Sequence, residues 1–303
     1  MARPTKSGVI LEWNRCPETG CQNPGSSREK YMNAENTFIE RALTIPVEGS
    51  DLHVKLLSQV DASTEGDCPV IVFLHEALGS VGQWKSFPWE LCRATGCDGV
   101  VYDRRGHGQS SAVREPRDLD FYRSEAEVYL RGLLDELNVR RPILFGHSDG
   151  ATIALKYASS FPEETVAVVS EAAHVIIEEI TLEGIREAKQ IYATTDLGTK
   201  LARYHGDKTD AVFRAWADTW LAPGLAKWNM LDDLRKITCP VLVVQGEDDQ
   251  YGSRLQVDSI TNHVSGESEL LWIEGCGHVP HLQARGRVLE STTALISALL
   301  RNS

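Results

Sequence analysis

The sequence predicts an α/β fold, in which a mostly parallel, doubly wound sheet carries a helical cap inserted after its sixth strand. Short apolar runs typical of strands alternate along the chain with segments whose apolar residues recur at helical spacing. This alternation stops between about residues 171 and 238. The pattern there is helical and carries three tryptophans, Trp216, Trp220 and Trp228.

The first strands are predicted from alternation and from apolar runs. Residues 38–47 and 51–60 alternate well enough for two strands, with Gly49 and Ser50 in the turn between them. Residues 70–74 form a short, wholly apolar run, as expected for a strand that is covered on both faces.

The remaining core elements follow in order. Apolar residues recur at helical spacing from residue 121 to 138, and Pro162 closes a helix that begins near Ser148. Further segments with strand or helix character are the strands in "GVVYD", "RPILFG", "TVAVVS", "CPVLVVQG" and "ELLWI", and the helices at 84–96 and 288–300.

These patterns divide the chain into three parts. Residues 1–35 are rich in proline, glycine, serine and asparagine, so we expect an extension of low order. The core is expected at 36–170 and 239–303, and the cap at 171–238.

Composition limits the class of protein. The chain has 303 residues, of which 42% are hydrophobic and 24% charged, as in ordinary soluble proteins. Its net charge of −12 argues against nucleic acid or an anionic membrane as the main partner. No apolar run approaches the length of a transmembrane helix, and the seven scattered cysteines favour a reducing, cytoplasmic location. We expect a small molecule as the partner, and a homodimer stays open.

One stretch, "ILFGHSDGATIAL", places a serine where chemistry is expected. A strand ends at Gly146, and a helix begins just after Ser148. A sharp strand-to-helix turn leaves no room for side chains beside its apex, which explains the glycines at 146 and 150. The turn therefore presents Ser148 at the carboxyl end of a parallel strand, where ligands bind.

A serine nucleophile needs a base, and the base needs an orienting acid. Two later strands end at the same edge of the sheet, and "EDDQYG" follows one and "EGCGHVPH" the other. The acid is thus expected among the carboxylates of residues 247–249, and the base is His278 or His281.

From about residue 38 to 300 the chain resembles the α/β-hydrolase fold superfamily, as a lidded serine hydrolase with a Ser-Asp-His triad. The resemblance implies that Asp249, three residues after Gly246, is the acid, with Asp248 as the alternative. It also implies His278, which follows "GCG", as the base, whereas His281 is expected in the pocket or in packing. Relatives that cleave haloalkanes or epoxides carry aspartate in place of Ser148.

An oxyanion hole is also required. One expected donor is the backbone N–H of Asp149. The resemblance implies Ala77 as the second, in the loop "HEALGS", where relatives often have glycine in place of Glu76. Glu76 is expected to form an ion pair that holds the loop, or to touch substrate or tune His278.

Four residues are our candidates for substrate contacts: Glu76, His147, Trp216 and Trp220. The loop "YDRRGHGQS" is expected to be structural. "HVPH" contains two histidines, but no carboxylate or third histidine is placed beside them in the sequence, so we predict no metal and no cofactor.

The resemblance implies hydrolysis of a small ester or lactone through a Ser148 acyl-enzyme, with Asp249 and His278 as the acid-base pair. One alternative is hydrolysis of a carbon–carbon bond in ring-cleavage diketones with the same triad. A third candidate is a ligand receptor with slow turnover.

Overall fold

A computed structural model describes residues 38–59, 69–113, 117 and 120–302. The predicted extension at 1–35 lies outside the described residues. Within them the chain forms one eight-stranded sheet with the order β1-β2-β4-β3-β5-β6-β7-β8. The strands are β1 (Phe38–Val47), β2 (Ser50–Gln59), β3 (Val70–Leu74), β4 (Gly99–Tyr102), β5 (Pro142–His147), β6 (Ala167–Glu171), β7 (Val241–Gly246) and β8 (Ser268–Ile273).

The strand directions confirm a mostly parallel sheet. β2 pairs antiparallel with both β1 and β4, and every pair from β4 to β8 is parallel. β3 and β5 lie side by side in the middle of the sheet and are buried along almost their whole length. The carboxyl ends of the parallel strands therefore meet at one edge, which is where the predicted catalytic turns follow.

The first hairpin turns one residue earlier than predicted. Val47 pairs with Ser50, so Glu48 and Gly49 are the two turn residues, with φ angles of 47° and 75°. A two-residue turn of this kind needs positive φ at both positions, which favours glycine at the second. Ser50 therefore begins the next strand.

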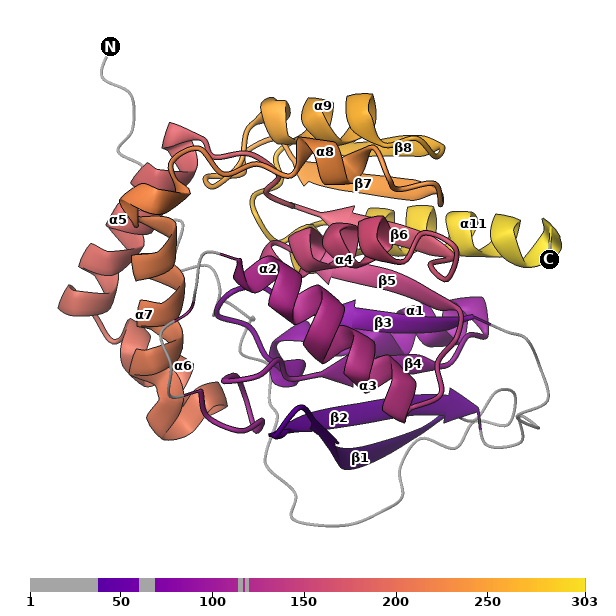
Figure 1. The fold of residues 1–303 in the computed structure, drawn as a ribbon, viewed down its shortest axis with the longest axis horizontal. Coiled ribbons are helices and arrows are strands. Elements are labelled where there is room, and N and C mark those ends of the chain that lie inside the picture. The colour runs from indigo at the N-terminus through magenta and orange to yellow at the C-terminus, as the bar shows by residue number, and fades with distance from the viewer. Residues whose placement is uncertain (1–37, 60–68, 114–116, 118–119, 303) are drawn as a thin grey trace. The chain divides into compact units, whose positions relative to one another are not determined.

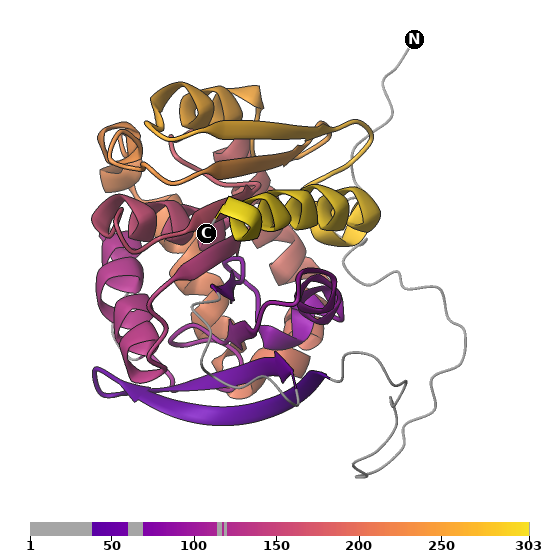
Figure 2. The same ribbon diagram turned by 90° about the vertical axis from the view of Figure 1, so that its right-hand side faces the viewer.

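Helices cover both faces of the sheet (Figures 1 and 2). α1 (Phe87–Thr95) packs on α11 (Arg285–Asn302) over one face. α4 (Asp149–Ser160) lies over the other, beside the segment 121–136. That segment was predicted as one helix, but it contains a stretch of π-helix, Glu125–Leu130, between α2 (Phe121–Ser124) and α3 (Arg131–Glu136).

The cap lies between β6 and β7 in the chain, as the sequence predicts. In Figure 1 its long helices stand beyond one end of the strands. The cap helices are α5 (Glu179–Thr194), α6 (Leu197–His205), α7 (Thr209–Trp220) and α8 (Leu231–Leu234). Two further helices, α9 (Arg254–His263) and α10 (Pro280–Gln283), were not singled out in the sequence. No helix among the described residues has the length and apolarity that crossing a membrane requires.

Candidate active site

Ser148 lies at the apex of the turn between β5 and α4, with φ of 54° and ψ of −119°. This conformation strains the backbone of any residue other than glycine, so contacts with the surrounding structure must hold it in place. Part of that support is a hydrogen bond of 2.8 Å from the Ser148 N–H to the carbonyl oxygen of Glu171. The turn thus projects the hydroxyl away from the sheet.

The two glycines beside this turn are required by close backbone contacts. A Cβ atom on Gly146 would lie 2.3 Å from the carbonyl oxygen of Gly150. One on Gly150 would lie 2.0 Å from the carbonyl oxygen of Leu74 and 2.7 Å from that of His75. The beginning of α4 therefore packs directly on the end of β3.

We expect Gly150→Ala to lower the free energy of unfolding by at least about 3 kcal/mol, because backbone atoms cannot move aside as a side chain can. Urea unfolding would measure this. Gly286→Ala is the matched control, since nothing lies within 4 Å of its added Cβ, and a change within about 1 kcal/mol is expected there. Equal stabilities of the two variants would contradict the packing described.

Three side chains from separate turns meet at Ser148. The Nε2 atom of His278 lies 3.0 Å from the Oγ of Ser148. The Nδ1 atom of His278 lies 2.9 and 2.8 Å from the two carboxylate oxygens of Asp249. All three residues are buried. This is the arrangement of nucleophile, base and orienting acid that serine hydrolysis needs.

Asp249 is held as a carboxylate. It accepts hydrogen bonds from the Gln245 amide at 2.7 Å and from the Tyr251 backbone at 2.8 Å. Burial alone would raise the pKa of Asp249, but the charge and hydrogen bond of His278 and the hydrogen bond from the Tyr251 backbone outweigh it, and the pKa lies below its usual value. Its neighbour Asp248 is exposed and is not at His278.

The loop after β3 is fixed next to the nucleophile turn. Arg104 donates a hydrogen bond of 2.9 Å to the carbonyl oxygen of Glu76, and His107 bonds that of Ala77 at 3.0 Å. Because α4 packs on the end of β3, the backbone N–H groups of Ala77 and Asp149 belong to adjoining segments. This placement suits a shared oxyanion hole.

The side chain of Asp149 is held by three neighbouring side chains. Arg117 lies 2.7 Å away, the hydroxyl of Tyr122 donates at 2.8 Å, and Arg104 is 3.8 Å away. Burial opposes ionisation, but the two arginines lower the pKa of Asp149 to about 2. Sequence reasoning missed Arg117 and Tyr122. The sequence signal for such partners was Asp149 itself, because a carboxylate in a buried turn needs a cation or hydrogen-bond donors beside it.

Glu76 and His147 are turned into the protein beneath the triad. Nδ1 of His147 lies 3.6 Å from a carboxylate oxygen of Glu76, which is the kind of ion pair expected for Glu76. Nε2 of His147 donates a hydrogen bond of 2.8 Å to the carbonyl oxygen of His278. Both side chains are buried. In this structure both side chains hold neighbouring loops in place, and their substrate contacts stay a prediction.

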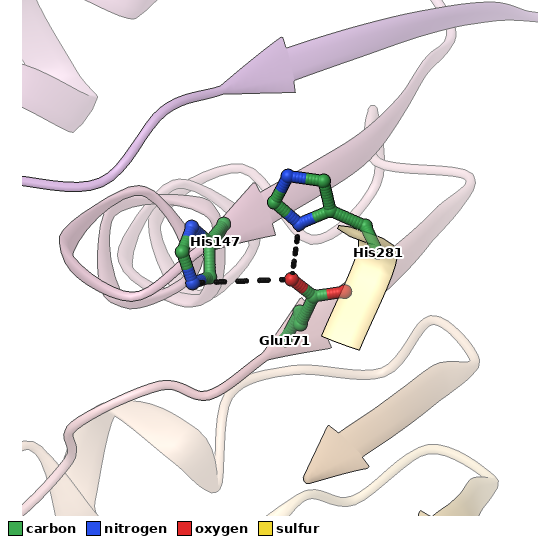
Figure 3. A group of neighbouring side chains, drawn as sticks. All are labelled: His147, Glu171 and His281. Carbon is green, nitrogen blue, oxygen red and sulfur yellow. Dashed lines mark hydrogen bonds and ion pairs between the residues drawn. The ribbon is translucent and has the colours of Figure 1, made fainter. Parts of the chain in front are cut away.

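The ends of two strands and α10 bring together His147, Glu171 and His281 (Figure 3). Nδ1 of His281 donates to Glu171 at 2.6 Å, and Nε2 of His147 lies 3.9 Å from the same oxygen. The carboxylate that "HVPH" lacks in the sequence is thus supplied by Glu171, from a strand more than a hundred residues earlier. His281 is engaged here and is not the base at Ser148.

The spacing within this cluster suits hydrogen bonds better than a metal ion. Two ligands of a tetrahedral zinc ion, each about 2.0–2.1 Å from it, are roughly 3.3 Å apart, whereas His281 and Glu171 are 2.6 Å apart. Burial would lower the pKa of His147, but Glu76 and Glu171 raise it to about 9. These distances describe a buried ion-pair network of two histidines and one carboxylate.

We expect the charge of His147 to make stability depend on pH. Because its folded pKa of about 9 lies above the ordinary 6.5, the stabilisation is complete below pH 6.5 and is lost as the pH rises through 9. The groups that face His147 are Glu76, Glu171, His278 and His281. His147→Gln keeps an N–H donor but no charge, so its Tm should lack this component.

The measurement is Tm against pH for wild type, His147→Gln and the control His263→Gln, which alters a histidine at the end of α9. A parallel decline in all three proteins between pH 6.5 and 9 would show that His147 does not carry this charge.

The two candidate tryptophans lie on α7, one ring away from the triad. Trp216 packs against Tyr251 at 6.3 Å between ring centroids, and Tyr251 packs on His278 at 4.9 Å. Trp220 packs on His174 at 5.2 Å, and His174 lies 6.0 Å from His278. Tyr251 and His174, which no sequence pattern indicated, therefore lie between these two tryptophans of the cap and His278.

Comparison with known proteins agrees with this geometry. The human protein "Serine hydrolase BPHL" is 28% identical over 194 residues, which are 61% of this chain and 64% of the relative, so the match spans less than two thirds of that protein. "Bifunctional esterase/perhydrolase DCH" from Acinetobacter calcoaceticus is 26% identical over 217 residues, covering 61% of this chain and 75% of the relative.

A solved structure described as a putative lipase from Acinetobacter baumannii shares the fold. Its TM-score is 0.70 at 18% identity, covering 87% of this chain and 93% of that one. The model of the family described as "Alpha/beta hydrolase family" matches residues 71–291, which is more than half of the chain. The turn at Ser148, the parallel sheet and this match together establish that the chain belongs to the alpha/beta hydrolase family, and its relatives support a hydrolase.

Proposed function

We propose that the protein hydrolyses a carboxylic ester or lactone of a small molecule through an acyl-enzyme on Ser148. The observation that carries the proposal is the position of His278, 3.0 Å from the Ser148 hydroxyl and bonded on its other side to Asp249. An alcohol is a poor nucleophile until such a base removes its proton. The esterase named among the relatives supports an ester as substrate.

In the first half of the reaction the Oγ of Ser148 attacks the carbonyl carbon, and its proton passes to Nε2 of His278. Asp249 holds the imidazole by its Nδ1–H and stabilises the imidazolium that forms. The N–H groups of Asp149 and Ala77 stabilise the negative oxygen of the tetrahedral intermediate. The C–O bond then breaks, and His278 returns the proton to the leaving alcohol.

In the second half, water attacks the acyl carbon while His278 takes one of its protons. The tetrahedral intermediate collapses, the acid leaves, and the proton returns to Ser148. During this exchange the imidazole of His278 must stay between the oxygens of Ser148 and Asp249. The buried network supports this position, because His147 forms a hydrogen bond with the backbone carbonyl of His278. The Arg117 clamp fixes Asp149 in the same way.

Labelling with a fluorophosphonate tests the proposal. Intact mass should show one adduct per chain, and peptide mapping should place it on Ser148. Wild type should also turn over p-nitrophenyl acetate or butyrate many times per active site. Labelling without turnover of either ester would sink the ester assignment and favour a carbon–carbon hydrolase or a slow receptor. An adduct on another residue would overturn the nucleophile.

A further inference from the structure

A cavity of about 700 Å³ lies between the loop after β4, the start of the segment 121–136 and α7. None of the three triad residues lines it. Helix α7 borders both regions, and different residues of it face each one. Trp216 and Trp220 pack against the rings beside the triad, whereas Ala211 and Ala215 line the cavity.

The lining of this cavity is basic, although the chain carries a net charge of −12. Its charged side chains are five cations and two carboxylates: Arg104, Arg105, Arg117, Lys208, Arg214, Glu125 and Asp218. Asp218 pairs with Lys189, which is not part of the lining, at 2.7 Å. Burial raises the pKa of Glu125 and so favours its neutral form. The cavity therefore carries an excess of positive charge.

Three of the five cations are already paired with carboxylates. Arg117 and Arg104 hold Asp149, and Arg214 pairs with Asp210 at 2.9 Å. Within the described part of the chain, Arg105 and Lys208 have no carboxylate at ion-pair distance. Among the described residues, Lys208 donates hydrogen bonds to the backbone carbonyls of His107 and Ser110.

Arg105 has a further unmet need. Its guanidinium lies over the ring of Tyr129, 4.3 Å from the centroid, which holds it in one orientation. Its Nε atom is buried without a hydrogen-bond partner among the described residues. Because this atom is closed to solvent it does not face the cavity, so an anion there would be held by the terminal N–H groups of the guanidinium.

The cavity is also joined to the catalytic turn. Arg117 lines it and at the same time bonds the carboxylate of Asp149, the residue after the nucleophile. Alanines, a valine and Phe121 complete the lining between the charged groups. A ligand with an apolar body and a negative end matches this distribution of surface.

We propose that the cavity binds the carboxylate of an anionic substrate, with Arg105 and Lys208 as its partners. The proposal rests on the proposed ester hydrolysis and gives it a substrate class: esters whose acyl part carries a second, free carboxylate. Arginine and lysine bind carboxylates by charge-assisted hydrogen bonds, which are stronger than those between neutral groups. Arg105 and Lys208 are thus specificity residues that lie apart from the triad.

The test compares p-nitrophenyl half esters of succinate, glutarate and adipate with the neutral p-nitrophenyl butyrate. Wild type should prefer one of the half esters by about 10- to 100-fold in kcat/KM, and the preferred length reports the reach from Ser148 to the cavity. Arg105→Gln and Lys208→Gln should each raise KM for that half ester by about 10-fold or more and change the neutral ester less than about twofold.

Arg214→Gln is the matched control, because Arg214 also lines the cavity but is exposed and already paired with Asp210. It should leave both esters within about twofold of wild type. Thermal melts confirm that each variant is folded. Equal effects of Arg105→Gln on the charged and neutral esters, or no half ester preferred at any length, would overturn the proposal.

Binding without turnover separates this proposal from the proposed function. Glutarate is titrated by calorimetry into Ser148→Ala, with and without Arg105→Gln. Arg105-dependent binding in a protein that hydrolyses none of the esters would keep the anion site and reject the ester function. Ester turnover without glutarate binding would reject the site.

Inhibition kinetics test whether the site belongs to the substrate. Free glutarate should compete with the half ester. If glutarate instead changes kcat for the neutral ester and does not compete, the site binds a separate effector, and the substrate assignment is overturned.

Discussion

Replacing Ser148 by alanine is expected to lower kcat for ester hydrolysis by about 10⁴- to 10⁶-fold. The loss is large because His278 then has no hydroxyl to activate. Asp249 and the oxyanion donors remain in place, but no serine oxygen is present to attack the carbonyl carbon. The measurement is the steady-state rate with the best ester, using protein whose fold is confirmed by circular dichroism. A variant that keeps more than about a tenth of the activity would mean that another group attacks the carbonyl.

Ser148→Gly is the matched variant, since it also lacks the hydroxyl but relieves the strain of the turn. Ser148 holds a φ of 54°, which glycine adopts without penalty. The glycine variant should be as inactive as the alanine variant and more stable than it by about 1–3 kcal/mol. Equal stability of the two variants in urea would argue that the turn is not strained.

Replacing Asp249 by asparagine is expected to lower kcat by about 10⁴-fold with little change in stability. An amide has the size of the carboxylate, but it neither stabilises the imidazolium nor reliably holds the N–H on Nδ1 of His278. Both oxygens of Asp249 lie within 2.9 Å of that atom. The rate loss should appear in kcat and in kcat/KM alike, because the interaction is strongest in the transition state.

Asp248→Asn is the control that the sequence itself offers. The neighbouring carboxylate is exposed, so its replacement should change kcat less than about twofold. Steady-state rates of both variants with one ester decide between them. A large loss in Asp248→Asn, with Asp249→Asn active, would mean that the turn after β7 is arranged differently in the working enzyme.

Much of the fold was predictable because it follows from local patterns. The strands of the parallel sheet read as apolar runs, since both of their faces are covered, and the turn at Ser148 carries the glycines that its close backbone contacts demand. The turn of the first hairpin was predicted one residue too late, at Gly49 and Ser50. Both glycine–serine and glutamate–glycine are possible turn residues, and only the pairing of Val47 with Ser50 shows which of the two forms the turn.

The sequence by itself therefore determined the order of the strands along the chain, the nucleophile turn and the short segments that hold an acid and a base. Only the tertiary structure decided which carboxylate reaches His278, since Asp248 and Asp249 are adjacent in sequence but differ in burial. It also decided that Glu171 completes a network with His147 and His281. The physical reason is distance along the chain: partners far apart in sequence meet only through the pairing of parallel strands, which no local pattern records.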